Sequence, residues 1–245
     1  MQPDEYRKMA EVEDRMWYYR ALHRHVARTL RNAIGPGAAV LDAGCGTGGL
    51  LRHLHTVGPS WQLSGLDISP LACQLTRERT GTEIAEGSVI KLPFADGMFD
   101  AITSCDVLCQ VEHPEAALRE FRRCLRPGGV VVVTMPAYQW LYSYHDRQVA
   151  NLRRYTAKCL TQLFRDASIQ PVHYTYWNAL PFPLAVLRRK LFPPRDPTSD
   201  VRLYPAPLEF MFNAMMALEH GWLSAGGRFP YGSSVLVVGR KPDQV

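Results

Sequence analysis

The segment AVLDAGCGTGG at residues 39–49 constrains the fold of this chain more than any other feature. An apolar strand pattern ends at Asp42, and glycines at alternate positions follow before LLRHL, which has the pattern of a helix start. Glycines at a strand-to-helix turn let the backbone approach a ligand closely, and a helix N-terminus offers free N–H groups and a positive dipole end. The segment therefore predicts a binding site for a nucleotide-type cofactor.

Asp42 discriminates between two classes of cofactor. Gly44, Gly46 and Gly49 satisfy the dinucleotide fingerprint, and Asp67 lies near the offset of a ribose-binding acid. A carboxylate at position 42 would repel a pyrophosphate, whereas it suits S-adenosylmethionine (SAM), which carries an α-ammonium, a sulfonium and no phosphate. SAM is therefore the predicted cofactor, with an NAD-dependent enzyme and a glycine turn without any ligand as the alternatives.

Composition indicates one ordinary α/β domain. The 245 residues are 47% hydrophobic and 21% charged, enough for a full core and an appended lid. The net charge of +5 is spread along the chain, so no nucleic-acid partner is predicted. The six cysteines show no CxxC pair and no zinc spacing, which predicts reduced thiols, no metal and a cytoplasmic location.

Two segments bear on targeting. The charged start, MQPDEYRKMAEVEDR, has no apolar core of a secretory signal, so none is expected. Residues 169–187 lack Asp, Glu, Lys and Arg over the length of a spanning helix, but three prolines and several polar residues interrupt them. We expect a strand and a broken apolar loop there instead.

Strand and helix patterns alternate after a first helix at 4–31, which predicts a parallel sheet covered on both faces. The expected strands are 38–43, 62–68, 83–89, 99–105, 130–135, 172–177 and 234–240, and the expected helices between them are 48–57, 70–80, 114–125 and 156–167.

The alternation stops in residues 178–231, which are rich in proline, aromatics and methionine and contain one helix pattern at 208–222. A long excursion near the cofactor end of a sheet is usually functional. We therefore divide the single domain, 1–245, into an N-terminal helical lid at 1–31, a SAM-binding core at 38–136, the rest of the sheet at 137–177 and 232–245, and an inserted acceptor lid at 178–231.

Four ordered motifs resemble those of the class I SAM-dependent methyltransferases. The first and second are VLDAGCGTGGL and LSGLDIS, the third and fourth lie in EGSVIKLPFADGMFDAITSCDVL, and FRRCLRPGGVVVVTMP is similar to the helix, turn and strand that follow. The resemblance implies a Rossmann-like α/β fold, with a seven-stranded, mostly parallel sheet, helices on both faces and an antiparallel last strand. MWYYR and MPAYQWLYSYHD with RRYT more loosely resemble a bacterial subgroup acting on small molecules or lipid-linked glycans.

The resemblance also implies cofactor contacts. Asp42 would face the methionine moiety, Asp67 would accept both ribose hydroxyls, and the Cys105 carbonyl would hold the α-ammonium. Ile68 would pack on the adenine, although core packing is an equal alternative for Ile68 and Cys105. The predicted cofactor-binding residues are Tyr18, Asp42, Gly44, Cys45, Gly46, Asp67, Ile68, Ser88, Val89 and Cys105.

Three residues are candidates for a general base. His145 and Asp146 are adjacent after the strand at 130–135, and a carboxylate can orient an imidazole and raise its basicity. His113 precedes Pro114 at a helix start. The alternatives are a solvated loop for His145 and an ordinary helix N-terminus for His113.

The predicted acceptor contacts include residues at which the chain departs from the subgroup it resembles. Cys109 and Gln110 stand where relatives usually have an acidic residue and a histidine, and Leu152 stands where histidine is frequent. Altered acceptor chemistry is the implication. The predicted substrate-binding residues are Tyr19, Gln110, Tyr144, Arg153, Arg154 and Trp177.

These features together predict a SAM-dependent methyltransferase of a small, partly hydrophobic acceptor of the natural-product or other secondary-metabolite type. A methyltransferase of lipid-linked glycans is an alternative, in which Arg188, Arg189 and Lys190 would meet lipid headgroups in a peripheral membrane contact. A non-catalytic SAM-binding protein is another. The identity of the acceptor, the atom methylated, the oligomeric state and the pathway stay open.

Overall fold

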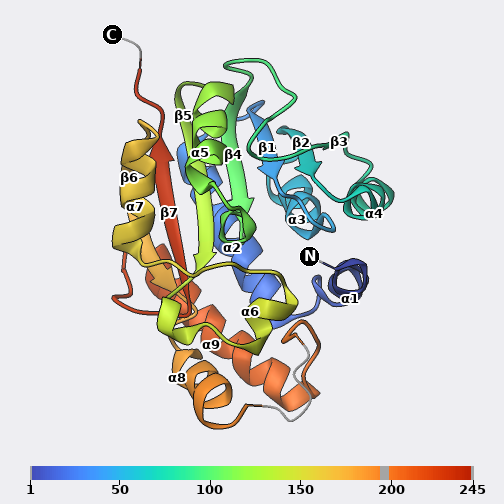
Figure 1. Cartoon of the computed structure of the whole chain (residues 1–245), viewed down its shortest axis with the longest axis vertical. Helices are drawn as coiled ribbons and strands as arrows, with labels where there is room; N and C mark the ends of the chain where they lie inside the picture. Colours follow the sequence, from blue (N-terminus) through green and yellow to red (C-terminus); the bar gives the residue numbers. More distant parts are fainter. Residues whose placement is uncertain (1, 194–198, 244–245) are drawn as a thin grey trace.

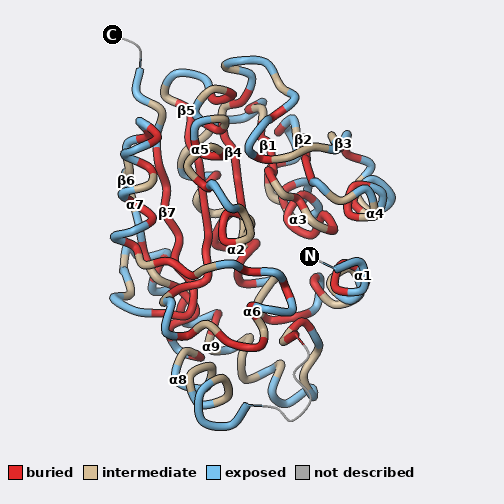
Figure 2. Tube along the Cα trace, in the orientation of Figure 1, coloured by how far each residue is buried: buried red, intermediate tan, exposed pale blue. Residues whose placement is uncertain are grey.

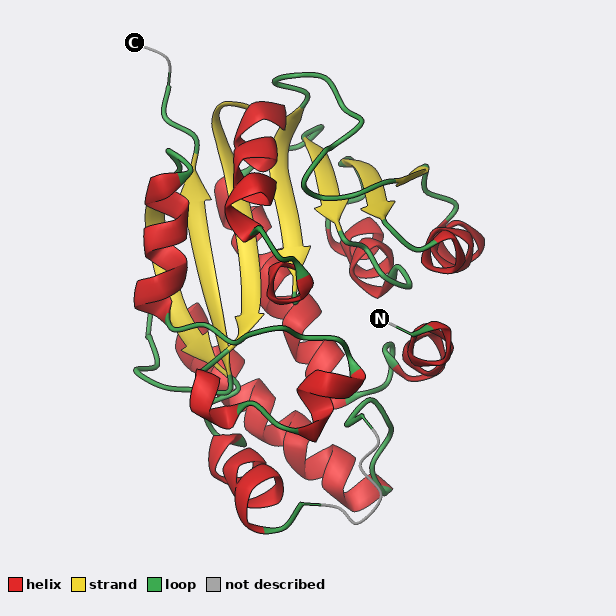
Figure 3. Ribbon diagram, viewed as in Figure 1, coloured by secondary structure: helices red, strands yellow, loops and turns green. Residues whose placement is uncertain are grey.

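The computed structural model describes residues 2–193 and 199–243 and contains one seven-stranded sheet with helices on both faces (Figures 1 and 3). The strand order is β3-β2-β1-β4-β5-β7-β6, and β7 alone is antiparallel to its neighbours. The predicted sheet is thereby confirmed. The strands are β1 (Ala39–Ala43), β2 (Gln62–Asp67), β3 (Ile84–Glu86), β4 (Phe99–Cys105), β5 (Leu125–Pro136), β6 (Gln170–Trp177) and β7 (Ser234–Arg240).

Helices cover the sheet at both faces and extend beyond its end (Figure 1). The helices are α1 (Pro3–Val12), α2 (Trp17–Ala33), α3 (Gly49–Val57), α4 (Pro70–Thr80), α5 (Pro114–Cys124), α6 (Tyr144–Gln148), α7 (Ala157–Asp166), α8 (Phe182–Val186) and α9 (Ala206–Ser224), with short helical turns at Leu108–Gln110, Gln139–Leu141 and Leu187–Leu191.

Strand β5 explains why two cores form. Val131 and Val133 join α5 and α7 in one buried cluster, whereas Val130 and Val132 join α2 and α9 in the other. Successive side chains of a strand point to opposite faces, so an uninterrupted run of valines needs cover on both. Figure 2 shows the buried central strands between the partly exposed helices.

Local signals fix several helix ends. The Ser69 hydroxyl accepts from the Ala72 N–H at the start of α4, and Gly81 ends that helix with a φ of 67°. Thr156 caps α7 in the same way through Cys159 N. These caps explain why the helices expected at 70–80 and 156–167 are close to the observed bounds.

Two expectations about element lengths were wrong. The single helix expected at 4–31 is split into α1 and α2, because the chain turns at 13–16 to bury Glu13 and Met16. The strand expected at 83–89 shortens to β3, since residues beyond Glu86 turn back, with a bridge between Ser88 and Lys91. No helix within the described residues is long and apolar enough to cross a membrane.

Candidate functional site

A cavity of about 610 Å³ lies beyond the carboxyl ends of β1, β2, β4 and β5. In open α/β sheets ligands bind at this edge, and ligand pockets usually measure about 300–1,000 Å³. Helix α1, the start of α2, the loop after β5 and the segment between β6 and β7 complete the walls (Figure 1). One cavity therefore joins the predicted cofactor residues to the predicted acceptor region.

Every predicted cofactor-binding residue lines this cavity, and their contacts with a cofactor stay predictions. They are Tyr18, Asp42, Gly44, Cys45, Gly46, Asp67, Ile68, Ser88, Val89 and Cys105.

The turn after β1 requires glycine. Gly44 and Gly46 have φ values of 90° and 56°, in the region that other residues rarely adopt. A Cβ at Gly44 would lie 2.3 Å from the Cγ2 atom of Val107. The turn is therefore held tightly against the loop after β4, which brings the two predicted cofactor segments together.

Asp42 lies at the cavity wall and is 2% exposed. Its Oδ1 accepts a hydrogen bond of 2.8 Å from the Thr103 hydroxyl. Burial raises the pKa of Asp42 to about 7, with a further contribution from the nearby carboxylates of Asp67 and Glu13. A cationic ligand group at this wall would favour the ionised form, so the site suits a sulfonium or ammonium cofactor and disfavours a diphosphate.

Asp67 has room for one further donor. Its Oδ1 accepts from the Tyr6 hydroxyl at 3.3 Å and from Ser69 N at 2.9 Å, and its Oδ2 accepts from Gly46 N at 2.9 Å. A carboxylate oxygen has two lone pairs, so one position at Oδ2 remains. Asp67 can therefore take one ribose hydroxyl as it stands, and the second once the Tyr6 hydroxyl moves away.

Helix α1 is tied to the cofactor turn by buried polar contacts. Glu13 accepts a 2.6 Å hydrogen bond from the Thr47 hydroxyl and forms an ion pair with Arg79, whose guanidinium also donates to the Thr47 carbonyl at 2.6 Å. The sequence interpretation missed Tyr6 and Glu13, because no motif marks residues that reach the site from a separate helix.

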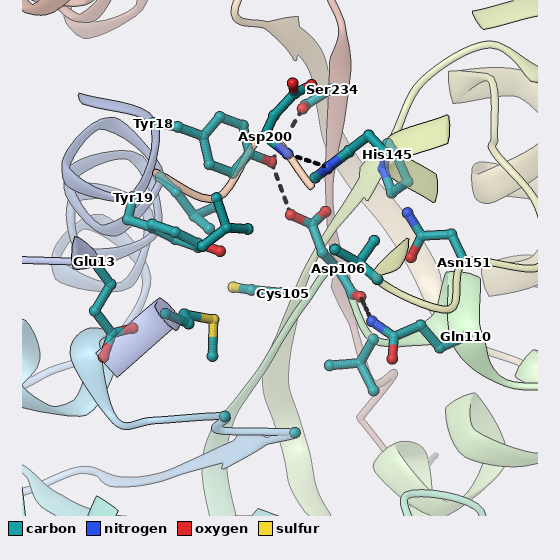
Figure 4. Close-up of a pocket in the computed structure, with 18 of the residues that line it drawn as sticks. Glu13, Tyr18, Tyr19, Cys105, Asp106, Gln110, His145, Asn151, Asp200 and Ser234 are labelled. Atoms are coloured by element: carbon teal, nitrogen blue, oxygen red, sulfur yellow. Dashed lines mark hydrogen bonds between the residues drawn. The ribbon is translucent and has the colours of Figure 1, made fainter. Parts of the chain in front are cut away.

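His145 lines the cavity, but its geometry does not suit a general base. Its Nδ1 accepts a 3.0 Å hydrogen bond from Asp200 N (Figure 4), so a neutral ring carries its proton on Nε2. Burial, assisted by the Arg189 guanidinium, lowers the pKa of His145 to about 4. The ring is therefore neutral at pH 7 and is a hydrogen-bond donor at Nε2.

The other two candidate bases lie outside the cavity lining. Asp146 is fully buried and accepts from Arg154 Nε at 2.8 Å and from Asn151 at 3.0 Å. His113 is exposed at the start of α5, 3.5 Å from the Glu115 carboxylate. Neither side chain faces the predicted acceptor.

The predicted acceptor contacts divide into two groups. Tyr19, Gln110 and Arg154 line the cavity. Tyr144, Arg153 and Trp177 are outside its lining. The Tyr144 hydroxyl donates to Asp200 at 2.9 Å, Arg153 donates to the Glu112 carbonyl at 3.1 Å, and the Trp177 ring is fully buried against the ring of Tyr18.

The basic triplet at 188–190 is not the exposed patch that a headgroup contact requires. Arg188 and Arg189 line the cavity, and both approach the Asp200 carboxylate, at 3.4 and 3.0 Å. Lys190 donates to the Tyr142 carbonyl at 3.1 Å. The two guanidinium groups therefore belong to the acceptor end of the cavity.

Asp106 is a cavity residue that the sequence interpretation did not assign. It follows the last residue of β4 and has a φ of 56°. Its Oδ2 accepts a 2.8 Å hydrogen bond from the Tyr18 hydroxyl, while Oδ1 is buried and has no partner among the residues that the structure describes. Burial raises the pKa of this carboxyl. Its position directly after a central strand was the one available signal.

Comparison with known proteins identifies the domain. Residues 41–133 match the methyltransferase domain family. An uncharacterized 37.1 kDa protein of Streptomyces fradiae transposon TN4556 is 36% identical over 140 residues, which are 55% of this chain and 40% of that protein. Staphylococcus aureus demethylmenaquinone methyltransferase is 32% identical over 124 residues, 46% of this chain and 52% of that enzyme. The chain thus spans about half or less of these curated relatives.

Solved structures of low identity share the fold. A Haloferax volcanii protein described as a methyltransferase candidate, solved with the Trm112 methyltransferase activator, has a TM-score of 0.69 at 22% identity and covers 99% of this chain and 95% of its own. A geranyl diphosphate methyltransferase in complex with SAM has a TM-score of 0.62 at 17% identity, with 89% and 84% covered. Residues 41–133 therefore belong to the methyltransferase domain family, on a chain with the fold of the class I SAM-dependent methyltransferases.

Proposed function

We propose that this protein transfers a methyl group from SAM to a small, partly hydrophobic acceptor in the cytoplasm. The observation that carries the proposal is the single cavity that joins Asp42 and Asp67 to an aromatic and cationic acceptor end. The relatives support a small molecule as the acceptor, since they include methyltransferases of demethylmenaquinone and of geranyl diphosphate. All six cysteines are free, as expected of a reducing compartment.

The residues of the cavity would act mainly by orientation. When bound, SAM supplies a methyl group on a sulfonium that is already a good leaving group. Asp42 and Asp67 would hold the cofactor at one end, and Tyr19, Gln110 and Arg154 would hold the acceptor at the other. Placing reactants in line can contribute about 7–11 kcal/mol toward lowering a barrier. Closure by α1 and α8 would exclude water.

Calorimetry with SAM and with S-adenosylhomocysteine, its demethylated product, tests the cofactor. We expect micromolar binding, which Asp67→Ala abolishes and Asp42→Ala weakens. Asp100→Ala is a matched control, because Asp100 pairs with Arg126 and is outside the lining of the cavity. A folded wild-type protein that binds neither compound contradicts the proposal.

A lipid-borne acceptor is the second candidate, because several large apolar side chains near α8 and α9 are exposed. Phe210 and Leu218 are 77% and 71% exposed, and Leu191 and Phe192 are also exposed. Co-sedimentation with anionic vesicles tests it. Retention that Phe210→Ser with Leu218→Ser abolishes supports this candidate, whereas wild-type protein that stays in the supernatant excludes it. The exposed Leu152→Ser is the control.

A further inference from the structure

Asp106 has an unusual combination of backbone and side-chain geometry. Its φ of 56° lies in the left-handed region, where a residue with a Cβ is strained. The conformation follows the end of β4 and is stabilised by the Asp106 N–H, which donates to the Thr134 carbonyl at 2.9 Å. Such strain is found at functional sites, where it directs a side chain.

The carboxyl group of Asp106 faces the part of the cavity where the predicted cofactor residues meet the predicted acceptor residues. Figure 4 shows it between the Tyr18 hydroxyl and His145, with Cys105 below it on the strand. Cys105 is close enough to both Asp42 and Asp106 for these carboxylates to raise the pKa of its thiol, although burial is the larger cause. Asp106 thus directly follows Cys105, the predicted contact of the ammonium group, and lies toward the predicted acceptor residues.

The neighbours of Asp106 belong to the acceptor end. Gln110 Nε2 and Cys109 Sγ both donate to the Asp106 carbonyl, at 3.2 and 3.1 Å. The titratable and charged groups that influence its carboxyl are Tyr18, Arg154 and Asp146. The Arg154 charge is offset by its own ion pair with Asp146, so none of the residues that the structure describes is a dedicated cation for Asp106.

Tyr18 leaves one oxygen of Asp106 available. The Tyr18 hydroxyl donates to Oδ2 at 2.8 Å, and its oxygen is 3.4 Å from the Ser234 hydroxyl, so the donor is fixed from two sides. Oδ1 is buried and has no hydrogen-bond partner within the described part of the chain. An unpartnered buried acceptor is unfavourable, and a donor on a bound ligand would remove that cost.

From these contacts we propose that Asp106 is the catalytic proton acceptor for an acidic hydroxyl of the acceptor, a phenol or an enol, and that Tyr18 is its positioning residue. This inference rests on the proposed function. Asp106 Oδ1 takes the hydroxyl proton as the acceptor oxygen bonds to the methyl carbon. The methyl–sulfur bond breaks with its electron pair going to sulfur, so the products are a methyl ether, a thioether and a protonated Asp106.

An amine fits this geometry less well. A buried carboxylate beside an ammonium group stabilises the charged form, which keeps the nitrogen lone pair protonated and unreactive. A hydroxyl is neutral in the ground state and needs a proton acceptor only while it attacks. The chemistry of Asp106 therefore selects oxygen over nitrogen.

The experiment compares Asp106→Asn with the wild-type protein on matched phenols and benzylamines, using SAM as the donor. We expect methylation of phenols, a loss of about 10²–10⁴-fold in kcat in Asp106→Asn, and partial recovery in Asp106→Glu. Binding of S-adenosylhomocysteine, measured by calorimetry, stays within threefold of wild type. Asp166→Asn removes the same charge from the exposed end of α7 and retains full activity.

Two readouts separate catalysis from a structural role. The methylation rate of the wild type rises with pH as Asp106 ionises, and this rise is absent in Asp106→Asn. Tyr18→Phe shifts this rise in rate to higher pH, because the Tyr18 hydrogen bond lowers the pKa of Asp106. Infrared titration of the carboxyl band, without any acceptor, shows the same shift between wild type and Tyr18→Phe.

Three results would overturn the inference. They are phenol methylation by Asp106→Asn within threefold of wild type, a fall in S-adenosylhomocysteine affinity that accounts for the whole loss, and a SAM-binding wild-type protein that methylates benzylamines or nothing. Failure of the wild type to bind SAM or S-adenosylhomocysteine contradicts the proposed function instead, so the two failures are distinguishable.

Discussion

The cofactor end and the acceptor end of the cavity are built in different ways. Asp42, Gly44 and Gly46 lie in one strand and the turn after it, and the backbone of that turn shapes the wall. His145 is held by the backbone N–H of Asp200, and Arg154 is held by the Asp146 carboxylate; both partners come from other segments. A short motif can therefore specify the cofactor end, whereas the acceptor end depends on contacts between distant parts of the chain.

Breaking the buried ion pair of the acceptor end has the largest expected effect. Arg154→Met leaves the Asp146 carboxylate buried without its cation, so we expect the free energy of unfolding to fall by about 3–5 kcal/mol. Urea denaturation measures the change. Arg126→Met, which breaks the half-exposed pair with Asp100, should cost at most about 1 kcal/mol, and equal losses would contradict the contrast.

Gly44→Ala tests the backbone conformation of the cofactor end. The new Cβ would approach Val107 closely at a φ of 90°, so we expect a loss of about 2–3 kcal/mol in the free energy of unfolding and weaker S-adenosylhomocysteine binding. Val107→Ala should restore part of the loss, because it removes the contact and leaves the backbone strain. Gly35→Ala is the control, since nothing lies within 4 Å of its added Cβ. An unchanged free energy of unfolding in Gly44→Ala would refute the tight approach of the two loops.

Asp42 should give the ligand-free protein a pH-dependent stability. Its pKa is raised to about 7 in the folded chain, against 3.8 as the ordinary value, so between these values the folded state holds a proton that the unfolded state has lost. Stability therefore falls as the pH rises through this window, by at most about 1.4 kcal/mol per pH unit from this group. Urea denaturation at pH 5 and pH 7 should show a smaller fall in Asp42→Asn. If the free energy of unfolding changed equally with pH in wild type and Asp42→Asn, Asp42 would be ruled out as the cause.

Tyr6→Phe has the smallest expected effect and the opposite sign for binding. Loss of the hydroxyl frees one lone pair of Asp67 Oδ1 for a ribose hydroxyl, so S-adenosylhomocysteine should bind about twofold to tenfold more tightly, as one ordinary hydrogen bond allows. Calorimetry measures the change, with Tyr142→Phe as a control at a hydroxyl that bonds to the Asn151 carbonyl. Weaker binding would mean that Tyr6 supports the cofactor.

The sequence predicted the sheet and the glycine turn after β1 well, because both are encoded in consecutive residues. The alternation of strands and helices, and the glycines after β1, are local patterns. The acceptor end was harder. His145 and Asp146 are neighbours on α6, where successive side chains point about 100° apart, so only His145 reaches the cavity. Arg153 and Arg154 divide in the same way between the outside and the interior.

Other site residues carry little or no local signal. Tyr6 reaches Asp67 across 61 residues of sequence, and Asp200 reaches His145 across 55. Asp106 was visible as an acid after a strand, but its free oxygen and its bond to Tyr18 depend on the packing of α2. Such pairings are decided by tertiary structure, which a single sequence does not state.

The segment between β6 and β7 suggests how the acceptor of the proposed reaction could be changed. It leaves the sheet at Trp177 and returns at Ser234, and these two residues face each other across one rung of the antiparallel ladder. A transplanted segment from another protein would need to bridge only that single gap, and doubling its length would cost only about 0.6 kcal/mol in closure entropy. Leu184, Arg188 and Tyr204 would be exchanged together with it, while the glycine turn stayed untouched. Protein engineering could thus exchange the segment between β6 and β7 as one unit.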